Sequence, residues 1–308
     1  MTIVPFSKEH IAAAASLLEE RHRRHREAEP LLPSSLDFRA EIGALWEKDG
    51  ASGAFAEGGY IVGTRLDESW GPNAWIELAG HAVRDAELIR DLYAFAASRW
   101  VEEGRTRHYV YVPASDAELV DAWFRVGFGA QHAFGIRELD EVASVDIPRV
   151  VTRHAEQRDI DAMVAIGPEL GKHQSLSPVF SEFRPYDEDE FRAELLGDLD
   201  NPKIGNLVAE LDGRVVGNFV VVPVEMSGAH VGLARPPGLA HLGYAAVVPD
   251  ARGSGAGLAL TAATFAWARE RGYEAMVTDW RVTNLLSSRF WPNRGFRTTF
   301  LRLYRSIP

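Results

Sequence analysis

The stretch VVPDARGSGAGLALTAATFAWARERG, residues 247–272, decides the fold. An apolar strand pattern runs into three alternating glycines, Gly253, Gly255 and Gly257, and a helical pattern follows. Glycine disfavours the helix, so three of them at a helix start indicate that something must come close to the backbone. The unpaired N–H groups and partial positive charge of a helix start favour an anion there. The stretch therefore predicts an anion site between a strand and a helix.

Three phosphate-binding patterns compete for this loop. A P-loop needs a lysine after the glycines, and none follows. A dinucleotide fingerprint needs a third glycine where Leu258 stands. The pattern that fits is R/Q-x-x-G-x-G/A after a strand that ends in Val-Pro, with Arg252, Gly255 and Gly257 in its fixed positions.

A second pattern lies nearer the C-terminus, an asparagine followed by an aromatic pair and then by Gly-Phe. It is carried by Asn284, Phe290, Trp291, Gly295 and Phe296. Together the two patterns resemble the GNAT family, the acetyl-CoA-dependent N-acetyltransferases, over residues from about 150 to 308. The resemblance implies an α/β fold with a mixed, mostly antiparallel central sheet flanked by helices. It also implies that acetyl-CoA binds at the glycine loop.

The first half of the chain repeats the order of elements of the second. Residues 116–128, DAELVDAWFRVGF, align with residues 284–296, NLLSSRFWPNRGF, at an offset of 168, since 284 − 116 is 168. A helix that ends in glycine and an aromatic residue is also a common local pattern, but we favour duplication. We expect two GNAT-like domains, residues 1–139 and 149–308, joined by a linker at 140–148. The whole resembles a tandem GNAT protein, an arrangement also found in mycothiol synthase.

The first half lacks the glycine loop. No glycine stands between Gly80 and Gly104, and Asp85 and Glu87 occupy the expected helix start. Carboxylates there cap the free N–H groups and repel a phosphate. We therefore expect the first domain to be degenerate, to leave coenzyme A unbound and to wall the substrate cleft.

The resemblance also implies which residues contact the cofactor. The backbone at Val247 and Val248 would hold the acetyl carbonyl, and Asn284 would anchor the strand bulge or touch the coenzyme A arm. Asn284 is also a candidate cap of the helix that follows it, and the two roles can hold together. The expected cofactor-binding residues are Val247, Val248, Arg252, Gly253, Ser254, Gly255, Ala256, Gly257, Leu258, Asn284, Ser287 and Trp291.

The catalytic base and acid follow less directly from the resemblance. The family often has a glutamate base on the strand before the loop, whereas this strand offers His241 and Tyr244. An imidazole suits a base near neutrality, but a structural histidine is an equal alternative, and Glu225 is another candidate base. The family's usual acid is a tyrosine where Trp291 stands, and an indole is no usable acid. Tyr244 or Tyr304 would then substitute, or the thiolate would leave unassisted.

Composition limits the partners and the compartment. The 308 residues carry a net charge of −11 and contain no cysteine. An acidic chain argues against nucleic acid or an anionic membrane as the main partner. The absence of cysteine excludes disulfides and cysteine-based zinc sites, and we expect no metal. No apolar run reaches the roughly 20 residues of a membrane span, and the first residues lack a signal-peptide pattern. We expect a cytoplasmic monomer or homodimer.

These observations predict an acetyltransferase. By the resemblance, it moves an acetyl group from acetyl-CoA to a primary amine of a small molecule by direct attack in a ternary complex. The alternative is a non-catalytic acyl-CoA sensor or interaction protein, which Trp291 favours.

Overall fold

The computed structural model describes residues 2–140 and 147–308 and divides into two compact units. Unit 1 comprises Met1–Gly135, His230–Pro236 and Thr298–Pro308, and unit 2 comprises Ile136–Ala229 and Pro237–Arg297. Most of the expected linker at 140–148 lies outside the described residues. The compact units are discontinuous in sequence, so their bounds differ from those of the two expected domains, 1–139 and 149–308. The expected domains describe the two repeated halves of the sequence and stay a prediction.

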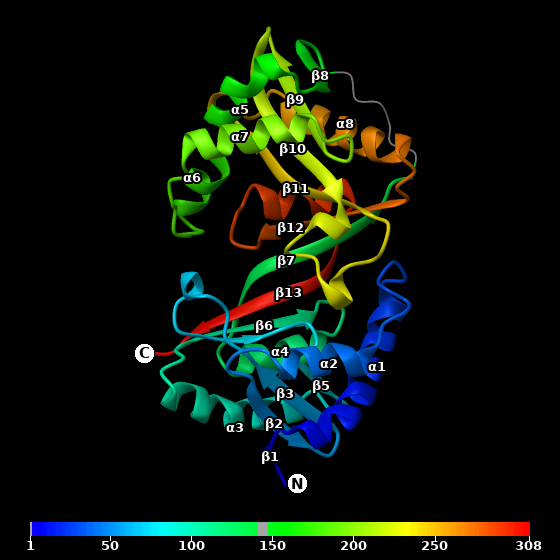
Figure 1. The fold of residues 1–308 in the computed structure, drawn as a ribbon, viewed down its shortest axis with the longest axis vertical. Helices are drawn as coiled ribbons and strands as arrows, with labels where there is room; N and C mark the ends of the chain where they lie inside the picture. The colour runs from blue at the N-terminus through cyan, green and yellow to red at the C-terminus, as the bar shows by residue number, and fades with distance from the viewer. Residues whose placement is uncertain (1, 141–146) are drawn as a thin grey trace. The chain divides into compact units, whose positions relative to one another are not determined.

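Unit 1 holds two sheets with helices packed on them. One sheet has the strand order β1-β2-β3-β5, and the other places β4, β6, β13 and β7 side by side in that order. Helix α3 packs on β2 and β3 (Figure 1), and the core closes around the fully buried Trp100 and Trp123. The elements of this unit are β1 (Val4–Pro5), α1 (Ile11–Ala28), α2 (Phe38–Trp46), β2 (Ser52–Ala56), β3 (Gly59–Gly63), β4 (Asn73–Ile76), β5 (His81–Val83), α3 (Leu88–Glu102), β6 (Arg107–Pro113), α4 (Ala117–Arg125), most of β7 (Gly129–Glu138) and most of β13 (Arg297–Ser306).

The sequence pattern predicts one strand over residues 74–83, and this prediction is wrong. The segment forms β4 and β5, which belong to different sheets. A turn separates them, in which the Gly80 N–H donates to the Glu77 carbonyl at 2.8 Å. A Cβ at Gly80 would lie 2.7 Å from the Val62 carbonyl oxygen. The close approach of two backbones, which hydropathy does not reveal, breaks the strand.

Unit 2 is built on a mixed, mostly antiparallel sheet, as predicted. Its order is β12-β11-β10-β9-β8. The pairs from β8 to β11 are antiparallel, and β11 and β12 are parallel. The elements are β8 (Val150–His154), α5 (Ile160–Ile166), α6 (Glu169–Ser175), α7 (Glu188–Leu199), β9 (Gly205–Leu211), β10 (Arg214–Pro223), β11 (Ala240–Val247), α8 (Ala256–Glu270), β12 (Ala275–Arg281) and α9 (Ser287–Phe290).

Helices cover both faces of the unit 2 sheet. On one face, Val208 of β9 packs with Met163 of α5 and Leu195 of α7. On the other face, a Cβ at Gly205 would lie 2.7 Å from the Trp267 ring of α8. Successive residues of a strand point to opposite faces, so residues 205 and 208 separate the two layers. Figure 1 shows α5 and α7 on one side of this sheet and α8 on the other.

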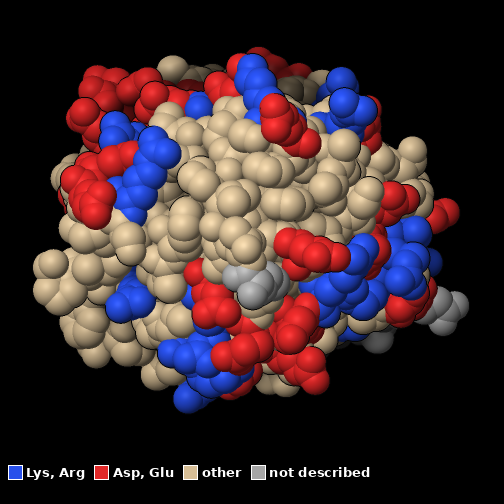
Figure 2. Space-filling view, turned by 90° about the horizontal axis from the view of Figure 1, so that it is seen from below, with Lys and Arg blue, Asp and Glu red and all other residues tan. Residues whose placement is uncertain are grey.

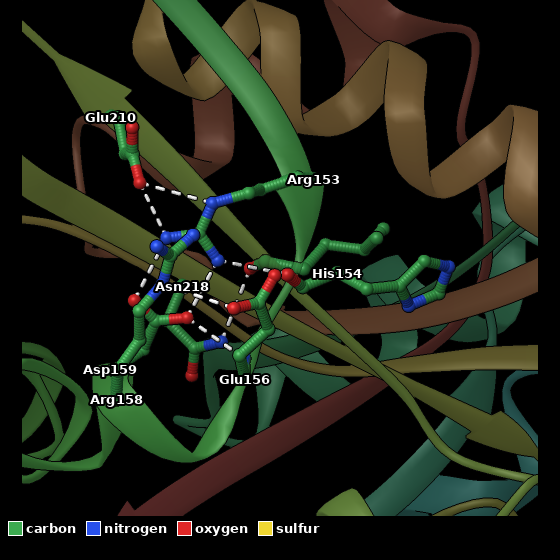
Figure 3. Close-up of polar contacts among 8 residues, drawn as sticks. Arg153, His154, Glu156, Arg158, Asp159, Glu210 and Asn218 are labelled. Atoms are coloured by element: carbon green, nitrogen blue, oxygen red, sulfur yellow. Dashed lines mark hydrogen bonds and ion pairs between the residues drawn. The ribbon is translucent and has the colours of Figure 1, made fainter. Parts of the chain in front are cut away.

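An ion-pair network ties the first strand of unit 2 to the helix that follows. Figure 3 shows the Arg153 guanidinium between the carboxylates of Asp159 and Glu210. Arg153 donates to the two oxygens of Asp159 at 2.6 and 2.8 Å, and the Glu156 N–H donates to Asp159 at 2.7 Å. Asp159 is only 4% exposed. Hydrogen bonds from Arg153, with a further contribution from its charge, hold the pKa of this carboxyl below its ordinary value.

We expect Asp159→Asn to lower the free energy of unfolding by about 3 kcal/mol at neutral pH, because it leaves Arg153 without its main partner. A group with a lowered folded-state pKa stabilises the fold above its unfolded-state pKa and loses that effect as the pH falls. The difference between wild type and variant should therefore stay constant down to about pH 4 and shrink below it. Denaturant titrations across pH measure this. The exposed Asp161, paired with Arg192, supplies the control: Asp161→Asn should change stability by less than about 1 kcal/mol.

The duplication is visible in the element bounds. Helix α8 begins and ends 168 residues after α3, β12 does so after β6, and β13 does so after β7, as 256 − 88, 275 − 107 and 297 − 129 all give 168. The predicted aromatic correspondence also holds. Trp123 meets the Phe128 ring edge-on at 4.9 Å, and Trp291 meets Phe296 in the same way at 5.7 Å.

The last strand of each half contributes residues to the unit built mainly by the other half. Arg305 of β13 lies in unit 1, where it packs on Gly127 and donates to the Val126 carbonyl at 2.6 Å. Arg137 of β7 lies in unit 2, where it packs on Gly295 and donates to the carbonyl just before it. The two arginines are themselves 168 residues apart, since 305 − 137 is 168. Unit 1 thus contains most of the last strand of the second half, and unit 2 contains the end of the last strand of the first half.

Charged residues are mixed on the molecular surface. Figure 2 shows Lys and Arg next to Asp and Glu around an area of uncharged side chains on the face it views. Several of these neighbours form exposed ion pairs, such as that of Lys8 with Glu47 at 2.7 Å. Among the described residues, no helix combines the length and the apolar character needed to cross a membrane.

Candidate active site

Strands β11 and β12 separate part of the way along their length. Their parallel register covers only Ala240 to Leu242 of β11, opposite Met276 to Thr278. Strand β11 continues to Val247 along β10, with a register irregularity opposite Gly243. The backbone edge of the second half of β11 therefore faces the space between the two separated strands.

The backbone N–H groups of Val247 and Val248 point to opposite edges of β11. The Val248 N–H donates to the Val216 carbonyl of β10 at 2.9 Å. Successive N–H groups of a strand point to opposite edges, so the Val247 N–H points to the edge from which β12 has separated. Of the two residues expected to hold the acetyl carbonyl, Val247 therefore has the N–H that faces this edge, whereas the Val248 N–H is used within the sheet.

The glycine loop leads directly into α8. Gly253 has a φ of +85° and Gly255 a φ of +90°. Gly255 is the residue before the helix in the left-handed conformation, which L side chains rarely adopt. The helix begins at Ala256, directly after Gly255 and within the predicted glycine loop. The Ala256 N–H donates to the Ser254 hydroxyl at 3.3 Å, whereas the N–H groups of the next two residues have no helical carbonyl four positions before them.

The loop, the end of β11 and α9 meet at one place. A Cβ at Gly257 would lie 3.8 Å from Val247 Cγ2 and 3.9 Å from Phe290 Cζ. A Cβ at Gly253 would meet no heavy atom within 4 Å. The half-buried Ser287, in the first turn of α9, keeps a buried hydroxyl without a hydrogen-bond partner among the described residues. The donors, the space above the loop and the exposed Arg252 fit a pyrophosphate-bearing molecule such as acetyl-CoA.

Asn284 is a capping residue. It is 3% exposed, and its side-chain oxygen accepts the N–H groups of Leu286 at 3.1 Å and Ser287 at 3.4 Å. The same oxygen lies 3.2 Å from Nε2 of His173 in α6. The capping alternative is therefore what the structure displays, and Asn284 fixes the start of α9 beside the loop.

His241 lies next to an acidic residue that sequence reasoning missed. His241 is 7% exposed, and its Nε2 lies 3.6 Å from Oδ1 of Asp279 on β12. The parallel register pairs His241 with Val277, so Asp279, two residues further, points to the same face. The pair sits where the strands separate. A Cβ at Gly243 would lie 3.2 Å from the His241 ring, so the small residue leaves room for the imidazole.

Tyr244 and Glu225 are held by other elements. The Tyr244 hydroxyl donates to the Ile166 carbonyl at 2.9 Å, with the Gly167 carbonyl at 3.2 Å. Burial raises the Tyr244 pKa well above its usual range, which makes it a poor acid or base. The exposed Glu225 accepts the Gly238 N–H at 2.9 Å and closes the loop between β10 and β11. These contacts favour structural roles over the predicted catalytic ones.

We expect Tyr244→Phe to lower the free energy of unfolding by about 1 to 2 kcal/mol, because two buried carbonyls lose their donor. The rate of acetyl transfer should change by less than about threefold, since the ring keeps its packing. Thermal unfolding and steady-state rates measure the two quantities. A large loss of kcat at unchanged stability would restore Tyr244 as the acid.

Trp291 and the remaining acid candidate, Tyr304, both pack against aromatic rings. Trp291 is 6% exposed and contacts the rings of Phe219, Phe290 and Phe296. This environment supports a packing role and speaks against the predicted cofactor contact. Tyr304 belongs to unit 1, where its ring lies 4.9 Å from that of Tyr109.

In unit 1, acidic residues stand where unit 2 has its glycine loop. Glu87 is the residue before α3, with a φ of −64° in place of the left-handed Gly255. Its carboxylate pairs with Arg125 at 2.8 Å, and Asp85 accepts the Glu87 N–H at 3.0 Å. Carboxylates thus occupy this helix start, and the expectation that the first half does not hold a phosphate stays a prediction.

Comparisons with known proteins agree with this geometry. The model of the acetyltransferase (GNAT) family matches residues 173–296. No curated protein sequence matches the chain. Among solved structures, a GCN5-related N-acetyltransferase from Sphaerobacter thermophilus is similar over 99% of this chain and 95% of that one, with 14% identity and a TM-score of 0.62.

Two further structures share the arrangement over nearly the whole chain. A tandem GNAT protein from the clavulanic acid biosynthesis pathway has 15% identity and a TM-score of 0.51, covering 99% of this chain and 98% of its own. A GCN5-related glucosamine N-acetyltransferase region of a fungal β-N-acetylglucosaminidase has 14% identity and a TM-score of 0.56, covering 98% of this chain and 38% of its own. At such identities the likeness establishes the fold.

The separated strands, the glycine loop and the mixed sheet define an acyltransferase-type α/β fold. Residues 173–296 match the model of the acetyltransferase (GNAT) family, and the chain as a whole has the fold of the GCN5-related N-acetyltransferase and of the tandem GNAT protein to which it is similar.

Proposed function

We propose that the chain transfers an acetyl group from acetyl-CoA to a primary amine of a small molecule, in a ternary complex in unit 2. The observation that carries the proposal is the meeting of Val247, Gly257 and Phe290 at the start of α8. Acetyl-CoA is the acetyl donor of the matched family. The loop offers its pyrophosphate free N–H donors and the positive end of a helix, and the glycines have no side chains that would block the approach.

Each part of the site then has a task in acetyl transfer. The loop from Arg252 to Leu258 would hold the pyrophosphate, and the Val247 N–H would donate to the thioester oxygen. Stabilising that oxygen as it gains negative charge lowers the barrier. Holding amine and thioester together removes much of the entropic cost of their encounter.

His241 is the proposed base. An amine must lose a proton before its nitrogen lone pair can attack the carbonyl carbon. In this reaction the N–C bond forms, the C–S bond breaks and the coenzyme A thiolate leaves, while the imidazole takes the ammonium proton. Asp279, 3.6 Å from Nε2, would stabilise the imidazolium that results. The thiolate needs no protein acid to leave, which accords with the packing roles of Tyr244 and Trp291.

Release of free coenzyme A thiol over a panel of small primary amines tests the proposal. We expect turnover with at least one amine and a mass increase of one acetyl group on that amine. If acetyl-CoA binds but no amine gives turnover, the protein is a non-catalytic acyl-CoA sensor. If acetyl-CoA does not bind, the assignment of the loop is wrong.

Three further expectations accompany this function. The acceptor is a small molecule rather than a nucleic acid, because the net charge of −11 does not favour a polyanion. We propose a cytoplasmic location, because acetyl-CoA and reduced thiols are present in the cytoplasm. The tandem arrangement fits a monomer as well as a homodimer, and sedimentation distinguishes the two.

A further inference from the structure

Unit 1 contains a cavity that the proposed acetyl transfer does not use. Its volume is about 490 Å³, within the usual range of small-molecule sites. It lies between α1, the segment after β5 and the start of α4 (Figure 1). Two lining residues, Arg84 and Asp116, stand 168 positions before Arg252 and Asn284. The cavity is therefore the unit 1 counterpart of the proposed cofactor cleft, with a different lining.

One side of this cavity is cationic. Arg21 of α1 is 2% exposed and donates to the carbonyls of Leu78 and His81. Its Nε has no hydrogen-bond partner among the described residues. Burial lowers the Arg21 pKa to about 10, which still leaves the guanidinium charged at neutral pH. The charge of the Asp116 carboxylate compensates part of the cost of burying this guanidinium, and a bound anion would compensate more of it.

Two further arginines line the cavity, and they differ in their partners. Arg24, one turn along α1, lines the cavity and reaches the Val83 carbonyl at 3.4 Å. Arg84 is already paired with Glu20 at 2.9 Å. His25 is neutral at physiological pH, because burial lowers its pKa to about 3.

The start of α4 adds acidic side chains to the lining. Asp116 and Glu118 line the cavity there. Asp116 uses Oδ1 to accept the Leu119 N–H at 3.0 Å, and Glu118 is exposed. A simple anion such as phosphate would meet these two carboxylates, and a simple cation would meet Arg21 and Arg24. A lining that carries charges of both signs suits a ligand that carries one charge of each sign.

We propose that this cavity binds a small zwitterion of the α-amino acid class, with its carboxylate toward Arg21 and Arg24 and its ammonium group toward Asp116 and Glu118. The degenerate half of the tandem protein is then a ligand-binding domain in its own right. This proposal stands on the residues of unit 1 alone and does not depend on the acetyl-transfer reaction.

Calorimetric titration of the full chain with a panel of free α-amino acids tests the proposal. We expect saturable binding of at least one of them. Its amide, which lacks the carboxylate, and its N-acetyl derivative, which lacks the ammonium group, should each bind at least about tenfold more weakly. Equal binding of either derivative, or no binding by any member at millimolar concentration, would overturn the proposal.

Variants locate the site. Arg24→Gln and Glu118→Gln should each weaken the amino acid at least about tenfold. Arg23→Gln is the matched control, because Arg23 pairs with Glu27 and does not line the cavity; its affinity should equal that of wild type. Gly255→Trp, which alters only the proposed cofactor loop, should also retain the amino acid. Binding that is lost in Gly255→Trp, or kept in both cavity variants, would place the ligand elsewhere.

Discussion

Gly255→Trp is expected to abolish acetyl-CoA binding and to lower kcat/KM for acetyl transfer by at least about a hundredfold. Gly255 adopts a φ of +90° at the start of α8, and a Cβ there would lie 2.5 Å from Ile147 Cδ1. An indole at this point would fill the space in which the pyrophosphate meets the N–H groups. Calorimetry with acetyl-CoA and steady-state kinetics measure the two losses.

The other end of the same helix supplies a control for backbone strain. Gly272 has a φ of +82°, and a Cβ there would meet no heavy atom within 4 Å. Gly272→Trp therefore carries a similar left-handed cost of about 1 to 2 kcal/mol in stability but leaves the loop intact. It should bind acetyl-CoA as wild type does. If the two variants lose activity equally, the effect is one of folding and the loop is not the cofactor site.

His241→Gln is expected to lower kcat by about 10² to 10⁴-fold while the affinity for acetyl-CoA stays unchanged, because a general base acts on the amine and not on the cofactor. Asp279→Asn should lower kcat less, by about tenfold, since it removes only the charge that stabilises the imidazolium. The pH dependence of kcat should change in both variants. His154→Gln is the control, as this histidine is exposed at the end of β8.

Two outcomes would contradict the role of His241. An unchanged kcat in His241→Gln would make the residue structural and would return the search for a base to Glu225. A fall in the affinity for acetyl-CoA equal to the fall in kcat would show a general disturbance of the strands around the site.

The sequence predicted the local backbone features around the candidate site. The strand, the glycines and the helix that follows them lie within residues 240–270, so their order is visible as a pattern. The match of Trp123 with Trp291 was also visible, because a buried aromatic residue before Gly-Phe packs alike in both halves.

Contacts between distant segments were beyond the sequence. Asp279 joins His241 only through a parallel register that composition does not reveal. The Tyr244 hydroxyl is occupied by carbonyls at Ile166 and Gly167, nearly eighty residues away along the chain. The break between β4 and β5 depends on the close passage of Gly80 over Val62.

The place of β13 in unit 1 has a consequence for how the protein is made. Unit 1 needs residues 298–308 for its second sheet, so it cannot be completed until this segment has been synthesised. A fragment that ends at residue 139 has no Arg305 to fill the place against Gly127. The two halves of the sequence therefore do not coincide with the two compact units. A protein cut at the linker should regain its structure only when both pieces are synthesised together.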